Sequence, residues 1–208
     1  MFRNIVSISA AAAIMAAIVL AQDARPASPV GSSAMQVGGK YEPGPEAPVY
    51  QGGKWIEVTY GRPIRRGRDV FGSGASYGKV ANPDAPVWRA GANVSTQVKT
   101  EVPLVIGGKR VAPGTYTMFI DLKPSNWTLI ISNWRAQSRY DPSNTKQIWG
   151  AYGYTPDKDV VRTPMKLEML PHSHEQLSWE FLDVTETSGT LALMWDKTMG
   201  SVAFKAGN

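Results

Sequence analysis

Short segments of alternating apolar and polar residues, bounded by Gly and Pro, constrain the fold of this chain more than any other feature. Such segments lie at residues 55–60, 96–102, 116–122, 161–169, 177–181 and 191–195. A period of two places alternate side chains on one face of a strand, whereas a helix needs a period of about 3.6. We find no convincing amphipathic helix after residue 21. The pattern therefore predicts an all-β chain.

The turns between these segments favour antiparallel pairing. Gly107 and Gly108 lie between two short apolar runs and supply the positive φ of a tight hairpin turn. Pro164 cannot donate a backbone hydrogen bond, so it places the segment at 161–169 at the edge of a sheet. With the shorter apolar runs included, the sequence predicts about nine or ten short strands. We therefore expect an antiparallel β-sandwich or flattened barrel with little helix.

The first 21 residues have the pattern of a secretory signal peptide. A basic start precedes an apolar run from Ile5 to Leu20, and small residues lie before a cleavage site ahead of Gln22. Retention as a membrane anchor is the alternative. Ser7 and Ser9 interrupt the run, and its many Ala residues make it weakly hydrophobic for a spanning helix, so cleavage is favoured. We expect an exported protein, either periplasmic or extracellular.

Two further segments follow the predicted signal peptide. Residues 22–49 are rich in Pro, Gly and Ala and can bury little, which predicts a flexible segment. Residues 50–208 are long enough for a single β domain with a real core. The chain has no Cys, so this domain must be held together by burial alone. No later segment is long and apolar enough to span a bilayer.

The charge of the chain bears on its partners. The formal net charge at pH 7 is +5, which allows an anionic ligand. A nucleic-acid interface would require more strongly clustered Lys and Arg side chains. We therefore expect no nucleic-acid partner. The sequence has no phosphate loop or dinucleotide fingerprint, so we expect no cofactor, and the oligomeric state stays open.

A long loop and the stretch after it hold the strongest candidate site. The loop from Gly61 to Pro86 is unusually long for a connection between strands, and such loops often carry function. The candidate ligand-binding residues are Arg62, Arg68, Trp88, Arg89 and Asn93. Guanidinium groups bind carboxylate, phosphate or sulfate bidentately, while an indole can form a stacking wall and an amide can orient a carbonyl or hydroxyl group. This interpretation predicts a non-enzymatic protein that binds a small anionic or carbohydrate ligand.

The same residues also have a structural interpretation. Arg62 and Arg89 can each pair with a carboxylate and tie the loop to the sheet. The available carboxylates are those of Glu57, Asp69 and Asp121. Asn93 can equally close a turn before the next strand. The protein would then be a structural or interaction protein of the cell envelope, with these residues as an internal polar network.

A metal site is the weakest candidate. His172 and His174 are two residues apart, so in a strand both imidazole rings share one face and could hold zinc together with a third ligand. The sequence identifies no third ligand, and the residues from Pro171 to His174 can equally form a polar turn. A metal-dependent hydrolase is therefore only a minor alternative.

The aromatic residues divide by position. Trp179 and Trp195 occupy alternating positions in strand segments, which indicates the core. The residues in or near loops are Trp88, Trp134, Trp149 and Tyr152. Aromatic rings at such positions can stack on sugar rings, although the fold alone is weak support for carbohydrate binding.

Several motifs of the chain resemble one bacterial family. They are Tyr60-Gly61-Arg62-Pro63, Val87-Trp88-Arg89-Ala90-Gly91-Ala92-Asn93, Gly107-Gly108-Lys109, Pro113-Gly114-Thr115-Tyr116 and Trp149-Gly150-Ala151-Tyr152. Over roughly residues 50–205 the chain resembles the family known as domain of unknown function 2911. In that family the Asn is commonly followed by Glu and then Ala-Thr, whereas Val94-Ser95-Thr96 follow here. The resemblance implies an exported, largely β protein, and it assigns no catalytic residue because the family brings no established activity.

Overall fold

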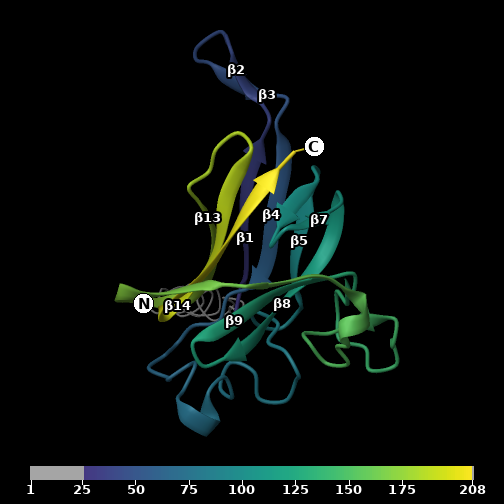
Figure 1. The fold of residues 1–208 in the computed structure, drawn as a ribbon, viewed down its shortest axis with the longest axis vertical. Helices are drawn as coiled ribbons and strands as arrows, with labels where there is room; N and C mark the ends of the chain where they lie inside the picture. Colours follow the sequence, from purple (N-terminus) through teal and green to yellow (C-terminus); the bar gives the residue numbers. More distant parts are fainter. Residues whose placement is uncertain (1–25, 208) are drawn as a thin grey trace, which may run out of the picture.

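A computed structural model describes residues 26–207 and shows an all-β protein (Figure 1). The predicted signal peptide, residues 1–21, lies outside the described residues. The described chain forms fourteen strands and two short 3-10 helices, η1 (Gly74–Ser76) and η2 (Pro156–Lys158). Within this range no helix has the length and apolar character needed to cross a bilayer. The predicted fold class is therefore confirmed.

The larger of the two main sheets has six antiparallel strands. In spatial order they are β1 (Val30–Val37), β4 (Lys54–Gly61), β5 (Thr96–Thr100), β8 (Gly114–Lys123), β9 (Asn126–Ser132) and β12 (Asp159–Pro164). Pro164 ends β12, which is the outer strand beside β9. Because an edge strand does not need every N–H for pairing, Pro is tolerated here, and its predicted edge position is confirmed.

The second sheet has four strands, and a long hairpin forms half of it. In spatial order they are β13 (Lys166–Leu182), β14 (Ser188–Ala206), β6 (Leu104–Ile106) and β7 (Lys109–Val111). Gly107 and Gly108 join β6 to β7 with φ angles of +58° and +75°, so the predicted hairpin turn is confirmed. The segment at 161–169 is not one strand. It leaves the first sheet at Met165, whose N–H donates to the carbonyl oxygen of Trp127 (2.8 Å), and then enters the second.

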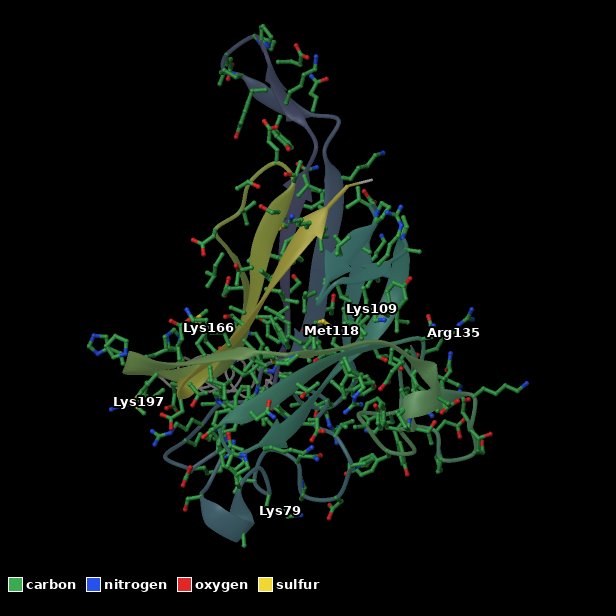
Figure 2. All side chains as sticks on the ribbon, viewed as in Figure 1. Lys79, Lys109, Met118, Arg135, Lys166 and Lys197 are labelled. Carbon is green, nitrogen blue, oxygen red and sulfur yellow. The ribbon has the colours of Figure 1, made fainter. Side chains whose placement is uncertain are left out.

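The core lies between the two sheets, which form an open sandwich rather than a closed barrel. Its buried residues include Val58, Val98, Met118, Ile120, Leu129, Leu177, Trp179, Leu191, Leu193 and Trp195. Met118 lies at the centre of the molecule, whereas Lys79 and Lys197 lie at its periphery (Figure 2). Trp179 and Trp195 are 0% and 3% exposed, so their predicted core positions are confirmed. Buried apolar area contributes roughly 25 cal/mol per Å², which is the main stabilising term for a chain without Cys.

β1 corrects the prediction of a flexible segment over residues 22–49. It pairs with β4 over all eight of its residues, with Val37 opposite Lys54 at one end. Met35 and Val37 are buried in the core. Without this pairing β4 would be an open sheet edge with unpaired backbone groups. The composition of residues 22–49 does not reveal this strand, because its pairing depends on backbone hydrogen bonds and only two of its side chains are buried.

Two smaller pairs of strands lie outside the sandwich. β2 (Lys40–Glu42) and β3 (Val49–Gln51) form a hairpin that projects beyond the two sheets (Figure 1). β10 (Arg135–Ala136) and β11 (Gln147–Ile148) form a parallel pair in the connection from β9 to β12. Together with β1, the short strands β2, β3 and β10 account for most of the difference from the predicted number.

The connection from β9 to β12, residues 133–158, packs on the outer face of the larger sheet. Phe119 of β8 and Ile130 of β9 point to this side, and Ile148 and Tyr154 lie with them in a second, smaller core. The ring centroids of Phe119 and Tyr154 are 5.1 Å apart. We call residues 133–158 the covering loop. This packing brings the covering loop next to the loop region that precedes β5, although the two are far apart in the sequence.

Candidate functional site

The stretch from Pro86 to Asn93 enters the sandwich at Trp88. The backbone groups of Trp88 and Ile120 exchange two hydrogen bonds of 2.8 Å, and the Trp88 side chain is 1% exposed. Its ring stacks on that of Trp195, with centroids 6.0 Å apart and an interplanar angle of 14°. Trp88 is therefore a core residue. In contrast to the prediction, its buried ring leaves no face on which a ligand could stack.

Three other elements hold the backbone of this stretch. The carbonyl oxygen of Ala90 accepts hydrogen bonds from the Trp179 indole of β13 (3.0 Å) and the Thr96 hydroxyl of β5 (3.2 Å). Two residues after the stretch, the Ser95 hydroxyl donates to the carbonyl oxygen of Gly150 in the covering loop (2.6 Å). The stretch is thus fixed by both sheets and by the covering loop, so its side chains have defined positions.

Arg89 is half-buried and forms no ion pair with the described residues. Its Nη1 donates to the carbonyl oxygen of Asn93 (2.5 Å), and its Cζ lies 5.3 Å from the ring centroid of Tyr152. The guanidinium also lies against Gly150, where an added Cβ would be 2.4 Å from the Arg89 Cζ. The positive charge of Arg89 is therefore held in place by neutral groups.

The carboxylates available to Arg62 and Arg89 are engaged elsewhere. The partners are Lys99 for Glu57, the backbone N–H of Gly72 for Asp69, and Lys123 and Arg162 for Asp121. Arg62 instead donates from Nε to the carbonyl oxygen of Leu177 in β13 (3.4 Å). The ion pairs of the structural interpretation are thus absent from residues 26–207, although Arg62 does connect the long loop to the second sheet.

The other arginines of the long loop have separate roles. Arg68 donates from Nε to the carbonyl oxygen of Arg65 (2.9 Å) and from Nη2 to that of Ile64 (2.6 Å). Arg65 pairs with Asp196 of β14, with Nε and Oδ1 3.2 Å apart. Arg66 is exposed. Arg68 therefore stabilises the turn within its own loop, whereas Arg65 connects the loop to the second sheet.

A cavity of about 270 Å³ lies beside this stretch, and we call it the arginine cavity. Its lining includes Pro63, Arg68, Trp88, Arg89, Asn93 and Trp195. Four of the five predicted ligand-binding residues meet here, and Arg62 does not line the cavity. None of the described lining residues is acidic, so the two guanidinium groups give the cavity a positive potential. The indole N–H groups of Trp88 and Trp195 are buried without a partner in the described chain, which leaves two unused donors on lining residues.

Asn93 combines a turn conformation with a place at the arginine cavity. Its φ of +62° is in the left-handed region that Asn tolerates better than most residues. Its Nδ2 donates to the carbonyl oxygen of Ser28 (3.2 Å), and both residues line the cavity. The turn role proposed for Asn93 therefore has direct geometric support.

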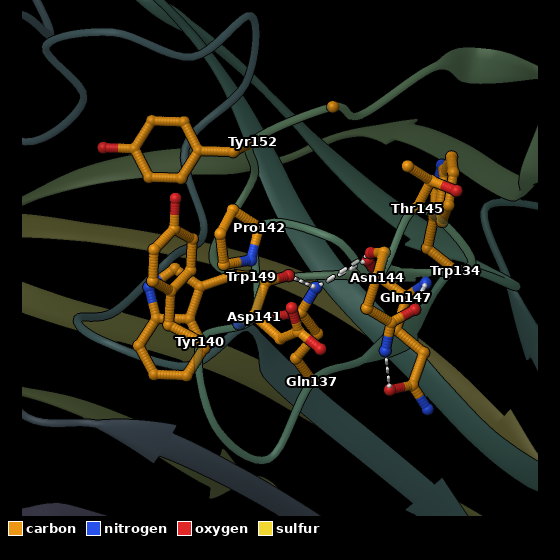
Figure 3. Close-up of a pocket in the computed structure, with 11 residues that line it drawn as sticks. Trp134, Gln137, Tyr140, Asp141, Pro142, Asn144, Thr145, Gln147, Trp149 and Tyr152 are labelled. Carbon is orange, nitrogen blue, oxygen red and sulfur yellow. Dashed lines mark hydrogen bonds between the residues drawn. The ribbon is translucent and has the colours of Figure 1, made fainter.

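The loop aromatics meet in a second cavity of about 350 Å³, formed by the covering loop (Figure 3). Trp134, Trp149 and Tyr152 line it together with Tyr140, which is not among the loop aromatics predicted from the sequence. The ring centroids of Tyr140 and Trp149 are 5.9 Å apart. No periodic pattern marks Tyr140, because it lies in a polar loop. Since Arg89 contacts Tyr152, the two cavities are neighbours.

The two histidines lie in β13, where its pairing with β14 is irregular. His172 is exposed, and His174 is half-buried opposite Asp196. Within residues 26–207 no group of three or more His, Asp or Glu side chains is arranged to hold a metal ion. The residues present around His172 and His174 therefore do not fit the three-ligand zinc site of a hydrolase.

One family model matches most of the sandwich. The model of a family described as "Protein of unknown function (DUF2911)" matches residues 43–204. No curated protein and no solved structure matches the chain. The matched range includes all five predicted ligand-binding residues and the whole covering loop, whereas β1 precedes it.

Proposed function

The chain belongs to the family described as "Protein of unknown function (DUF2911)", and we propose that it is an exported protein that binds a small anionic ligand without catalysis. The carboxylate, phosphate or sulfate group of the ligand lies in the arginine cavity, against Arg68 and Arg89. Export rests on the signal-peptide pattern of residues 1–21. The ligand is small, since the cavity lies below the roughly 300–1,000 Å³ of pockets for drug-sized molecules.

The observation that carries this proposal is the environment of Arg89. Its half-buried guanidinium has no carboxylate partner in the described chain, and the cavity that it lines has no acidic residue. Partial burial weakens the hydration of a charge, and an anion with bidentate geometry offsets that loss. Arg68 adds a second guanidinium to the same cavity. This combination favours an anion over a neutral or cationic ligand.

A second candidate function rests on the backbone contacts of the same arginines. Arg68 donates to the carbonyl oxygens of Arg65 and Ile64, and Arg89 donates to that of Asn93. In this alternative the guanidinium groups only stabilise loops of an envelope interaction protein. The two candidates differ in one measurable property, which is the response of the protein to anions.

The test is the melting temperature of the purified protein in phosphate, sulfate or citrate, each compared with chloride at equal ionic strength. An anion at a hundred times its Kd stabilises the native state by about 2.7 kcal/mol, which raises the melting temperature of a chain of this size by roughly 5–10 °C. We expect at least one of the three anions to do so, and Arg89→Gln to abolish the gain.

Arg66→Gln is the matched control. It removes the same charge from the preceding long loop, but Arg66 is exposed and does not line the arginine cavity. This variant should keep the gain of the wild type. Equal gains in the wild type and in Arg89→Gln would show a general salt effect and contradict the anion site. The absence of any gain in the wild type would favour the second candidate.

A further inference from the structure

Four aromatic side chains surround the cavity of the covering loop, which we call the aromatic cavity. Tyr140 and Tyr152 are 58% and 45% exposed, and Trp134 and Trp149 are half-buried. Aromatic rings in a folded protein usually bury their area in the core, as those of Trp88, Trp127, Trp179 and Trp195 do in this sandwich. Several partly exposed rings in one concave site are typical of a site that covers the apolar faces of a ligand.

We propose that the aromatic cavity binds a neutral oligosaccharide, whose sugar rings stack on the aromatic side chains and whose hydroxyl groups bind the amides beside them. This site differs from the arginine cavity in its residues and in the charge of its ligand, so it does not rest on the proposed function.

The aromatic cavity is rigid because one buried amide ties its loop together. Gln137 is 5% exposed, and its Nε2 donates to the carbonyl oxygens of Asp141, Asn144 and Gln147 at 3.0–3.1 Å. Its Oε1 accepts a hydrogen bond from the backbone N–H of Asp141 (2.8 Å). These bonds hold both ends of the loop from residue 137 to residue 147. A loop that is ordered before binding loses little conformational entropy when a ligand arrives.

The charges around the aromatic cavity have both signs, so they give no consistent preference for a charged ligand. Arg89 lies over the Tyr152 ring at 5.3 Å, and Lys158 Nζ lies over the Trp134 ring at 3.3 Å, so a cationic ligand would meet two positive charges. Asp141 also lines the cavity. Hydrogen bonds from the Ser143 hydroxyl and backbone N–H lower the pKa of Asp141, so its carboxylate is ionised and repels an anion. Each attraction for one sign of charge is thus opposed by a repulsion, and this mixed environment suits a neutral ligand.

The polar groups of the aromatic cavity suit hydroxyl groups. Asn144 Nδ2 donates to Gln147 Oε1 (2.9 Å), while Gln147 Nε2 makes no hydrogen bond to another described residue. This Nε2 can therefore donate to a ligand hydroxyl. In Figure 3 Tyr140, Trp149 and Tyr152 gather at one end of the cavity, and Trp134 lies at the other end with the amides between. Rings at both ends favour a chain of sugars over a single one.

The test is titration of the purified protein with neutral hexasaccharides of β-1,4-glucose, β-1,3-glucose, α-1,4-glucose, xylose and mannose. Binding is followed by calorimetry and by Trp fluorescence, which reports on Trp134 and Trp149 in the cavity wall. We expect at least one of the five to bind. Tyr140→Ala should weaken that binding about tenfold, because it removes one stacking ring. Tyr140→Phe keeps the ring and should bind as the wild type does.

Tyr41→Ala is the control, since it truncates a Tyr that is 72% exposed on β2, away from the aromatic cavity. It should change the Kd by less than about twofold. The proposal is overturned if none of the five hexasaccharides binds, or if Tyr140→Ala binds as tightly as the wild type. Binding of a neutral hexasaccharide that is lost in Arg89→Gln and kept in Tyr140→Ala would assign the ligand to the arginine cavity and also overturn the proposal.

Discussion

Arg89 takes its position from a glycine about sixty residues later in the chain. Gly150 has a φ of +62°, and a Cβ atom there would lie 2.4 Å from the Arg89 Cζ. The atom that it meets is the far end of a flexible side chain. An alanine at this position would therefore displace the guanidinium from the Tyr152 ring and from the arginine cavity, while the backbone stays in place.

Gly150→Ala and Gly153→Ala form a matched pair that tests this placement. Gly153 has a φ of +76° in the same loop, but an added Cβ there has no atom within 4 Å. Both variants carry the left-handed strain of a non-Gly residue, about 1–2 kcal/mol, which lowers the melting temperature by a few degrees. We expect only Gly150→Ala to lose the stabilisation by phosphate, sulfate or citrate as well. An equal anion response in the two variants would show that the site does not depend on the position of Arg89.

β1 shows at the scale of an element how a strand can form without a strong sequence pattern. Its pairing with β4 supplies backbone hydrogen bonds, and Met35 and Val37 are its only fully apolar buried side chains. Its other residues lie half-buried or exposed, and apart from Val30 they are small or polar. The side-chain contribution of β1 to stability therefore comes from a few positions, so single substitutions at these positions can measure it.

Val37→Asp and Ala34→Asp place the same charge on opposite faces of β1. Val37 is 2% exposed in the core, whereas Ala34 is exposed. Burial of an unpaired carboxylate should cost about 3 kcal/mol or more, and the exposed one less than about 1 kcal/mol. Urea unfolding monitored by circular dichroism measures both. Equal unfolding midpoints in the two variants would mean that residues 30–37 are not part of the sandwich in solution.

The whole molecule has one main core to which both sheets contribute. Residues of β4, β5, β8 and β9 pack there with residues of β13 and β14. The chain also crosses from the first sheet to the second at Met165, and the covering loop shares β8 and β9 with the core. Neither sheet can therefore lose its packing without exposing the other.

This shared core predicts one cooperative unfolding transition. Circular dichroism at far-ultraviolet wavelengths reports on the sheets, and Trp fluorescence reports on Trp179 and Trp195 in the core and on Trp134 and Trp149 in the covering loop. We expect the two signals to give the same midpoint and the same free energy of unfolding. Two separate transitions would show that the covering loop or one of the sheets unfolds independently.

The sequence by itself determined the features that depend on neighbours in the chain. Alternation between residues 96 and 122 predicted strands because a period of two is a local property of the backbone. Gly107-Gly108 predicted its hairpin, and Pro164 its edge strand, because both act through their own φ angle or missing N–H. The clustering of Arg68, Arg89 and Asn93 at one cavity could also be predicted from the sequence, since all three lie in one loop region.

Only the tertiary structure decided the features that depend on distant contacts. Trp88 is buried because Trp195 and Ile120 pack against it, and nothing in its own loop encodes them. β1 is a strand because its backbone groups pair with those of β4. The aromatic cavity forms because residues 133–158 fold back over β8 and β9. The exposure of a loop side chain depends on which distant segment covers it. Local pattern therefore predicts strands and turns, whereas ligand sites require the packed molecule.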